Sequence, residues 1–460
     1  MMRGDFNPML KKQQYCKTVR SVVVGILSTV VLVVNIALAS AATCISPWQA
    51  RIGSSLDDEI RAAVRDADGN LYLGGFESGH LGVENYWPVG DVRGFVEKRS
   101  SDGSLLWRRN FDTPGIDIVE AIALDSARHR VIIAGRTSGT LASPNAGQMD
   151  LFVASLAEDT ATVMSVGQFG DEYPQHPTGI AVLPSGDLVV SGFDDAYEVG
   201  NAVLGQPTLF LARFTQSPTE PSRLVQQWWL QPNEPGPQTP GSYAFAVAAV
   251  ADASEDVVVS TRNNGARVTR INGNGVLVWN KLVSSFFADN VIDVEMSASG
   301  RLYIAGATVL PLAGPALGNS DGFLMEIDPV SGSTLWGRQL GSAGVDWISS
   351  MAVDDRGRIF VGGVTNGSIV PGSSPAKNSI YTLTFSDLGA PLSGWQAATP
   401  SATDFVESLS IVPACDDRAL IAGHINGDLP ASPSIGKTDA IVLSVQLTGV
   451  GDPIYASGFE

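Results

Sequence analysis

A short motif that ends in a small residue and a glycine recurs along the chain at a nearly even interval. Its last residue, here called the anchor position, is Gly75, Gly135, Gly192, Thr261, Gly306, Gly363 and Gly423. Successive anchor positions are 60, 57, 69, 45, 57 and 60 residues apart, a mean of 58. Seven such units account for residues 44–450. A period of this length indicates a repeat architecture in which each unit buries its apolar face against the next.

Each unit contains four segments with the composition of β-strands. An inner segment leads through a Gly-containing turn to the strand of the anchor position, and a third apolar segment leads through a second turn to a fourth. The fourth segment carries a tryptophan near its start: Trp107, Trp279, Trp336 and Trp395. Four strands in about 58 residues make one antiparallel sheet, so the sequence predicts an all-β seven-bladed β-propeller. A Pro-rich insertion at 232–240 and a shortened unit four leave six or eight blades as alternatives.

The two ends of the repeat region complement each other. Residues 48–53 have the sequence pattern of a fourth strand and resemble residues 336–341, whereas the last unit ends with a third strand at 439–443. The N-terminal strand can therefore complete the last blade, which leaves no long sheet edge unpaired. This offset predicts a closed ring.

Two stretches carry a resemblance to a known family. Asp-x-x-Gly-x-Ile-Phe-Val-Gly-Gly at 354–363 and Gly-x-x-Asp-x-Phe at 318–323 resemble the repeats of secreted bacterial seven-bladed β-propeller proteins, the SBBP type. The resemblance covers all seven units. It implies the fold and export from the cell, and it implies no common activity.

The first 41 residues have the features of a secretory signal. Lys11, Lys12, Lys17 and Arg20 precede an uncharged apolar run at 22–39, and Ala39-Ser40-Ala41 offers small residues for cleavage. We therefore expect a signal peptide at 1–41, a propeller at 42–450, a short tail at 451–460, and an extracellular or cell-surface location, with the periplasm as a further option. The alternatives are an uncleaved anchor helix and, less well supported, a lipoprotein that begins at Cys44.

The charge balance excludes one class of partner. Loss of residues 1–41 takes Lys plus Arg from 29 to 24 and Asp plus Glu from 47 to 46, which changes the net charge from −18 to −22. A surface of this sign repels phosphate backbones and anionic lipid. We expect no nucleic-acid partner, no membrane span in the mature chain, and a monomer.

Export would leave two cysteines, Cys44 and Cys415. An even pair in an oxidising compartment predicts one disulfide. Cys44 precedes the strand that closes the last blade, and Cys415 lies in the first turn of the same blade. The bond would therefore fasten the ring; two unpaired thiols are the alternative.

One set of carboxylates recurs with the repeat. Asp58, Asp117, Asp289, Asp346 and Asp404 each lie six residues before a fixed position of the innermost strand. They can accept backbone N–H bonds and fix the loops between blades, or they can converge near the channel and bind a cation such as calcium. We predict no catalytic residue and no cofactor, and keep this acidic ring as the candidate metal site.

Other motifs have simpler structural explanations. Gly318-Asn319-Ser320-Asp321-Gly322 matches the spelling of a nucleophile elbow but lacks the strand before it and the helix after it. Asp66-Ala67-Asp68-Gly69-Asn70 begins like a calcium loop but lacks its distal ligand. The four histidines fall in four different units without metal-ligand spacing.

Three functions remain after these exclusions. The leading hypothesis is a non-enzymatic propeller that binds a protein or a glycan on one face, because the loops between its strands differ strongly in length. The alternative is a polysaccharide-acting or quinoprotein-like enzyme with its site at the channel mouth, which would require two carboxylates or a His–carboxylate set there. A structural adhesin is the third.

Overall fold

A computed structural model describes residues 48–81, 88–89, 92–194, 197–199, 202–204, 207–231, 242–373, 379–398, 406–414, 417–425 and 438–449. The chain divides into two units, Met1–Ala41 and Ala42–Glu460, and every described residue belongs to the second. Cys44, Cys415 and Asp404 lie outside the described residues, as do the segments 1–41 and 451–460. Within the described part of the chain, no helix is long and apolar enough to cross a membrane.

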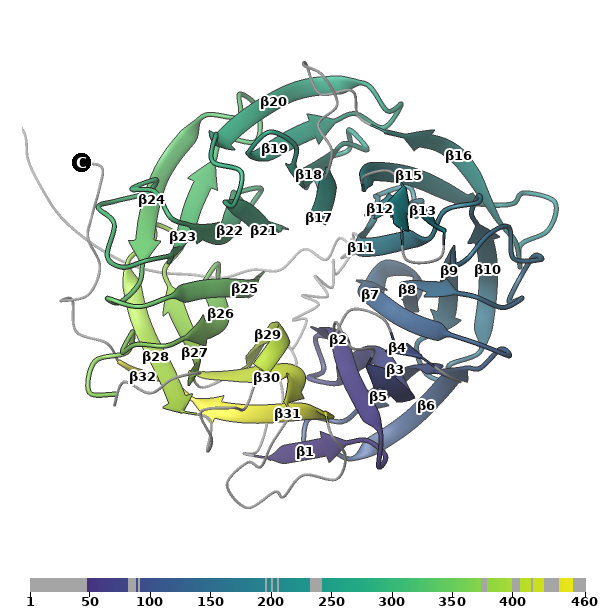
Figure 1. The fold of residues 1–460 in the computed structure, drawn as a ribbon, viewed down its shortest axis with the longest axis horizontal. Helices are drawn as coiled ribbons and strands as arrows, with labels where there is room; N and C mark the ends of the chain where they lie inside the picture. The colour runs from purple at the N-terminus through teal and green to yellow at the C-terminus, as the bar shows by residue number, and fades with distance from the viewer. Residues whose placement is uncertain are drawn as a thin grey trace, which may run out of the picture. The chain divides into compact units, whose positions relative to one another are not determined.

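The second unit is a seven-bladed β-propeller, which confirms the predicted fold (Figure 1). Each blade is a four-stranded antiparallel sheet whose strands follow one another outward from the centre. The strands of blades one to three are β2 (Asp57–Arg65), β3 (Leu71–Leu81), β5 (Arg93–Arg99) and β6 (Leu105–Phe111); β7 (Asp117–Asp125), β8 (Arg130–Thr137), β9 (Asp150–Ala157) and β10 (Val163–Phe169); and β11 (Gln175–Val182), β12 (Leu188–Asp194), β15 (Thr208–Gln216) and β16 (Leu224–Leu230).

Blades four to six repeat the same plan. Their strands are β17 (Tyr243–Ala249), β18 (Val257–Arg262), β19 (Ala266–Ile271) and β20 (Leu277–Ser284); β21 (Asn290–Met296), β22 (Leu302–Thr308), β23 (Asp321–Ile327) and β24 (Thr334–Leu340); and β25 (Asp346–Val353), β26 (Ile359–Thr365), β27 (Ser379–Phe385) and β28 (Pro391–Ala398). The remaining elements outside the blades are β4 (Pro88–Val89), which pairs with β3, the hairpin β13 (Tyr197–Val199) with β14 (Ala202–Leu204), and the short 3-10 helix η1 (Ser126–Arg128).

Blade seven joins the two ends of the ring. It combines β29 (Val406–Ala414), β30 (Arg418–Ile425) and β31 (Asp439–Gln446) with β1 (Gln49–Ile52), which pairs with β31. Arg51 of β1 also forms an ion pair with Asp439 of β31. The predicted closure by the N-terminal strand is therefore confirmed. A second closing contact was not predicted: β32 (Thr448–Gly449) pairs with the outer strand β28 of blade six.

The apolar core lies between the blades. Seven buried clusters each join one pair of neighbouring blades, including the pair formed by blades seven and one. Tryptophans of the fourth strands add cross-blade hydrogen bonds: Trp107 Nε1 donates to the carbonyl of Glu158, and Trp279 Nε1 donates to that of Pro329. Each blade thus buries apolar surface on both sides, which stabilises the ring as a whole.

The anchor position is explained by a β-bulge. In blades one to six, the innermost strand contains one extra, unpaired residue directly after the residue that pairs with the anchor position. These bulge residues are Arg61, Glu120, Thr178, Phe245, Ile292 and Ser349. The bulge brings a backbone carbonyl against the anchor residue, so that a Cβ atom at Gly135 would overlap the oxygen of Ile118. Glycine is the residue that permits this approach. In blade seven the shift lies between Glu407 and Leu409 instead.

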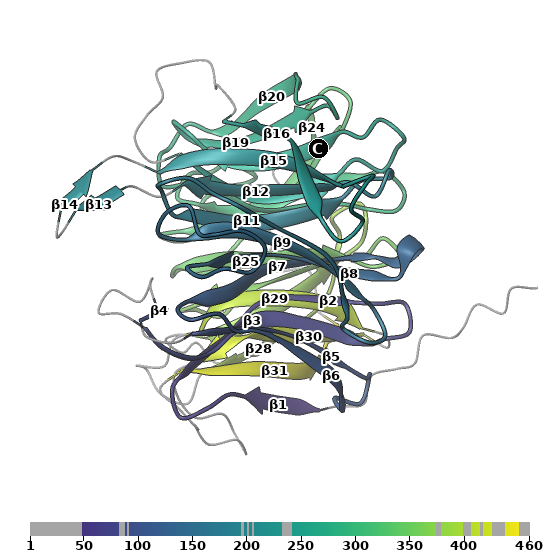
Figure 2. The same cartoon turned by 90° about the vertical axis from the view of Figure 1, so that its right-hand side faces the viewer.

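The two sides of the ring carry different connections. One side, here called the turn face, has the short hairpins within each blade, such as 66–70, 297–301 and 354–358. The other side, here called the loop face, has the segments between second and third strands and those between blades, such as 138–149, 285–288 and 309–320. Figure 2 shows β4 and the β13–β14 hairpin standing out on one side of the blades, and both lie in loop-face segments.

Candidate functional site

All seven innermost strands line one central cavity of about 950 Å³. The residue after each bulge is small in most blades: Ala62, Ala121, Gly179, Ala246 and Ser350. Small side chains at this level keep the channel open. Blade five departs from the pattern, because the same position holds Asp293.

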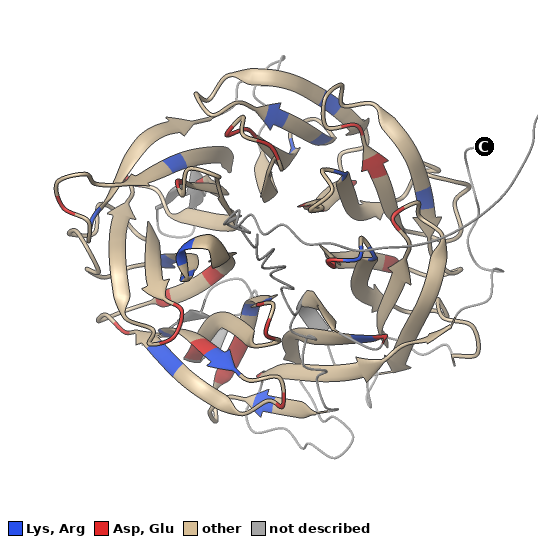
Figure 3. Ribbon diagram, turned by 180° about the vertical axis from the view of Figure 1, so that it is seen from behind, with Lys and Arg blue, Asp and Glu red and all other residues tan. Residues whose placement is uncertain are grey.

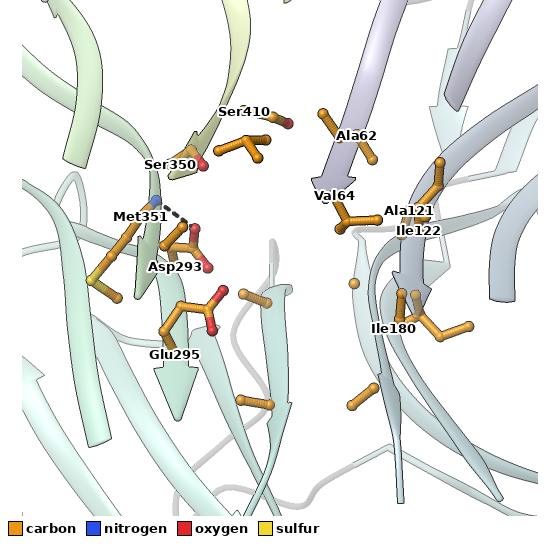
Figure 4. Close-up of a pocket in the computed structure, with 18 of the residues that line it drawn as sticks. Ala62, Val64, Ala121, Ile122, Ile180, Asp293, Glu295, Ser350, Met351 and Ser410 are labelled. Atoms are coloured by element: carbon orange, nitrogen blue, oxygen red, sulfur yellow. Dashed lines mark hydrogen bonds between the residues drawn. The ribbon is translucent and has the colours of Figure 1, made fainter. Parts of the chain in front are cut away.

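Two carboxylates of blade five point into the channel, facing Ala62, Val64 and Ile180 across it (Figure 4). Asp293 accepts hydrogen bonds from the backbone N–H groups of Val294 and Met351, both at 2.8 Å. Met351 belongs to blade six, so this bond crosses a blade interface. Glu295 follows two residues later on the same strand. The channel residues of the neighbouring strands, 245–249 and 349–353, carry no charge.

Burial raises the pKa of both carboxyls. It raises the pKa of Asp293 to about 6, although the two backbone N–H donors favour its ionised form. It raises the pKa of Glu295 well above the usual range, and the adjacent Asp293 raises it further. A carboxyl with a raised pKa can hold a proton near neutral pH and can donate or accept it.

The channel charges of blades one and two are arranged differently. Glu59 lies 2.6 Å from Arg61, and Glu120 lies 2.9 Å from Arg136 and 3.9 Å from Arg61. Burial alone would raise the pKa of Glu120, but Arg136 and Arg61 outweigh it and the pKa is lowered. Glu120 is thus kept ionised by arginines of the protein itself, whereas burial raises the pKa of Glu59 although Arg61 lies beside it.

Blade four places an arginine among aromatic rings at the channel mouth. The guanidinium carbon of Arg262 lies 4.5 Å from the centre of the Tyr243 ring and 5.9 Å from that of Phe245. One of its nitrogens donates to Oδ1 of Asn290 at 3.2 Å. Phe193 of blade three contacts Tyr243 edge to face, with ring centres 4.9 Å apart. Among the described residues, no carboxylate forms an ion pair with Arg262.

Exposed aromatic residues lie on the same side of the ring. Phe287, in the segment between blades four and five, is 75% exposed, and Trp347, near the start of β25, is 51% exposed. The Phe286 and Phe287 rings contact each other at 4.9 Å. The long segments between strands also emerge here, so the loop face carries most of the variation between blades. Around the ring as a whole, acidic and basic residues are interspersed (Figure 3).

The described members of the predicted acidic ring lie at the starts of the innermost strands, and none of them lines the channel cavity. Asp58 accepts hydrogen bonds from the backbone and hydroxyl of Ser54, and Asp117 accepts the same two from Thr113. Asp289 accepts from Ser284, Thr308 and Val309. Asp346 accepts from Ser342 and Thr365. These bonds fix the segments that connect blades.

No three His, Cys, Asp or Glu residues within the described ranges are grouped so that they could hold a metal ion. The described acidic-ring aspartates belong to four separate blades, and each accepts hydrogen bonds from neighbouring loops or strand ends. Asp404 is outside the described residues. Calcium binding at this ring stays a prediction without support from the described geometry.

The remaining sequence candidates have structural surroundings. Ser320 lies in the segment before β23, and its hydroxyl accepts a hydrogen bond from Trp347 Nε1 at 3.1 Å. Asp66 accepts the backbone N–H of Asn70 at 2.8 Å and so closes a hairpin turn. His129 is 84% exposed on the turn face, whereas His176 contacts Arg136 at 2.9 Å near the channel mouth.

Comparison with known proteins supports the repeat. Residues 335–369 match the family model described as SBBP, a beta-propeller repeat. The chain therefore contains an SBBP β-propeller repeat. The matched segment runs from β24 of blade five through β25 and β26 of blade six, and it includes Asp346, the bulge at Ser349 and Gly363. The resemblance inferred from 318–323 and 354–363 is confirmed at this level. No curated protein sequence matches the chain.

Solved structures with a similar chain course have low sequence identity. They include the Dos1 propeller, with 8% identity, a TM-score of 0.46, and 86% of this chain and 95% of that chain covered. Sqt1 from Chaetomium thermophilum has 14% identity, a TM-score of 0.43, and coverage of 85% and 97%. A protein of unknown function from Bacteroides caccae has 11% identity, a TM-score of 0.32, and coverage of 59% and 78%. Values of this size say nothing about a shared ligand.

Sequence reasoning found the SBBP repeat but missed the residues that interrupt it. Asp293 and Glu295 each place a carboxylate at a position that is small or apolar in the other described blades, and Arg262 stands at the position of Arg136 without a glutamate at the bulge. Aligning the seven units on the bulge would have shown Asp293 among small residues. The six-residue spacing from the acidic ring already aligned these positions in the sequence, but the side chains that line the channel required the structure.

Proposed function

We propose that the chain is a non-enzymatic binding module, secreted or at the cell surface, that takes a protein or glycan ligand on its loop face at the channel mouth. The proposal depends on a contrast between channel charges that have an ion-pair partner and one that has none among the described residues. The channel carboxylates of blades one and two have arginine partners, whereas Arg262 of blade four has no carboxylate partner within the described chain.

Two exposed aromatic residues also indicate that the loop face is the binding face. Phe287 and Trp347 are the two aromatic residues more than half exposed in the described part of the chain, and both lie at the loop face. Partly exposed aromatic rings contribute disproportionately to binding energy. The variable connections between strands are also at this face, where binding residues usually occur on a rigid scaffold.

The experiment uses the purified Ala42–Glu460 unit on a glycan array and in pull-downs from cell-surface extracts. For each ligand found, the loop-face variant Phe287→Ala/Trp347→Ala is compared with the turn-face variant Val330→Ser/Leu388→Ser, whose parent side chains are 76% and 66% exposed. We expect at least a tenfold loss for the first and no change for the second. Equal losses, or a loss in the turn-face variant alone, would reject the loop face.

A second candidate function is supported by Asp293 and Glu295. Two carboxyls inside one cavity, of which one is anchored by backbone N–H groups, have the elements of a general acid–base pair acting on a polysaccharide. Its test is release of reducing ends from neutral and acidic polysaccharides. Turnover that Glu295→Gln lowers at least a hundredfold, with Asp328→Asn on the turn face unchanged, would replace the binding proposal with this one.

A further inference from the structure

Arg262 is held differently from most arginines of the ring, although Arg65 and Arg338 also form no ion pair within the described residues. Arg130, Arg213, Arg270, Arg301 and Arg358 each lie within 3 Å of a carboxylate. Within the described residues, Arg262 contacts the amide oxygen of Asn290 and the faces of two aromatic rings, and it has no carboxylate partner there. An arginine carries five N–H donors, so most of its hydrogen-bonding capacity is unused.

The rings hold the guanidinium in a fixed place. Tyr243 and Phe245 are close to parallel, at 26°, with centres 6.3 Å apart, and the cation lies over both. Asn290, at the start of blade five, fixes the group from the side. Such a cation–π arrangement is favourable without neutralising the charge. The guanidinium is therefore positioned and still cationic.

The connection that follows Arg262, between β18 and β19, is short. In blade four, only residues 263–265 separate β18 from β19, whereas residues 138–149 separate the equivalent strands of blade two and residues 309–320 those of blade five. Arg262 is the last residue of β18, directly before this hairpin. The low rim of blade four places the guanidinium near the loop face and beside Phe245, which lines the channel.

We propose that Arg262, Tyr243 and Asn290 form a subsite for the carboxylate of a uronic acid residue in a glycan. The inference rests on the proposed function and names the chemical class of its ligand. A planar guanidinium binds a carboxylate through two parallel hydrogen bonds. The neighbouring aromatic rings suit the C–H face of a sugar, which an acidic peptide side chain does not have.

The charge of the protein limits the ligand further. The whole chain carries a net charge of −18, which disfavours a long polyanion. A single carboxylate on an otherwise neutral sugar avoids this repulsion and still pairs with Arg262. The subsite therefore fits an isolated uronic acid better than a continuous polyuronate.

The test compares three small probes by ligand-observed NMR and calorimetry on the Ala42–Glu460 unit. Methyl β-D-glucuronide carries the carboxylate on a sugar ring, methyl β-D-glucoside lacks the carboxylate, and N-acetyl-glutamate amide carries it without the sugar. We expect the glucuronide to bind at least tenfold more tightly than either of the others.

Substitutions then locate the contact. Arg262→Ala should weaken the glucuronide 10- to 100-fold, as expected for hydrogen bonds to a charged group, and Arg262→Lys should restore only part of the loss. Glucoside binding should not change in either variant. Arg109→Ala, an exposed arginine on the outer strand β6, is the matched control and should bind the glucuronide like the parent chain. Thermal unfolding confirms that each variant is folded.

The outcomes separate this inference from the proposed function. Equal binding of glucuronide and glucoside, or glucuronide binding that Arg262→Ala leaves unchanged, overturns the subsite while array ligands on the loop face remain. Tighter, Arg262-dependent binding of N-acetyl-glutamate amide overturns the sugar in favour of an acidic peptide. Glucuronide binding that depends on Arg262 but not on Phe287 and Trp347 supports the subsite and rejects the wider loop-face ligand.

Discussion

Blades two and four place an arginine at the same point of the repeat, directly after the anchor position. Arg136 follows Gly135 and is 3% exposed, with Glu120 at 2.9 Å. Arg262 follows Thr261, is partly exposed, and packs on Tyr243. The two arginines share a backbone position and have opposite electrostatic surroundings.

The bulge residue of the innermost strand makes the difference. It is Glu120 in blade two and Phe245 in blade four. A glutamate at the bulge neutralises the arginine within its own blade, whereas a phenylalanine offers only a ring. The repeat thus fixes where a cation is placed, and one variable residue decides whether it serves the fold or stays available to a ligand.

Blade five shows the same contrast for carboxyl groups that blades two and four show for arginines. Asp293 and Glu295 occupy channel positions where the other described blades have small or apolar residues, and the strands on either side contribute no cation. In blade two the fold therefore pairs Glu120 with arginines. Among the described residues, Arg262 of blade four and the two carboxyls of blade five have no ion-pair partner.

The largest effect is expected when a paired charge is broken. Arg136→Ala removes the nearest cation from Glu120, and the free energy of unfolding should fall by about 3 to 5 kcal/mol, because the carboxylate is left with only the more distant Arg61, at 3.9 Å. Chemical denaturation at pH 7 measures this loss. The double variant Arg136→Met/Glu120→Gln should recover most of it. An Arg136→Ala protein as stable as the parent would mean that blades two and four do not differ energetically.

A smaller effect is expected from the unpaired carboxyls of blade five. Burial raises the pKa of Asp293 to about 6 and raises that of Glu295 as well, so the folded chain binds their protons more tightly than the unfolded chain does. Their stabilisation is complete below about pH 4 and is lost as the pH rises through about 6. With about 1.4 kcal/mol per unit of pKa displacement, Asp293 alone accounts for a loss of about 3 kcal/mol between pH 4 and pH 8, and Glu295 adds to it.

The variant Asp293→Asn/Glu295→Gln isolates this contribution. Its free energy of unfolding should lack the loss through pH 6 that the parent chain shows in denaturation series from pH 4 to pH 8. Asp328→Asn removes an exposed carboxyl whose pKa is lowered by the N–H of Val330, and it should leave that loss unchanged. Identical pH profiles for the parent and the double variant would show that the channel carboxyls are not buried enough to titrate abnormally.

The fold could be predicted from the sequence because the recurring glycine at the anchor position reflects a close backbone contact within each blade. A Cβ atom would overlap the carbonyl oxygen of the inner strand at Gly75, Gly135, Gly192, Gly306 and Gly363, so the recurring glycine marks five of the blades. Thr261 and Gly423 complete the spacing. The closure was predictable for a related reason, since the N-terminal strand supplies the fourth strand that the last unit lacks. The pairing of β32 with β28 could not be predicted, because two residues carry no strand pattern.

The candidate site was less predictable, because it depends on departures from the repeat. Asp289 and Asp346 recur at a fixed spacing, which suggested a possible metal site, yet both accept hydrogen bonds from neighbouring loops and strand ends. Asp293 lies in the channel only because a bulge precedes it. Arg262 is distinguished by the two aromatic rings and the Asn290 amide around it, and this setting can be recognised only when the surrounding side chains have been placed.

The smallest change in stability is expected from rebuilding the blade-two pair in blade four. Phe245→Glu puts a carboxylate at the bulge residue beside Arg262, as Glu120 is placed beside Arg136. The new ion pair contributes up to about 1 kcal/mol at a partly exposed site, and the lost ring–cation contact costs about 0.5 to 1 kcal/mol, so the two nearly cancel. The free energy of unfolding should change by less than about 1 kcal/mol in chemical denaturation.

Binding of methyl β-D-glucuronide should nevertheless fall at least tenfold, because the guanidinium is now neutralised from within the blade. Phe245→Leu, which removes the ring without adding a charge, should reduce binding less than Phe245→Glu. If Phe245→Glu binds the glucuronide as the parent does, the bulge residue does not control the charge of Arg262, and the contrast between the two blades has another cause.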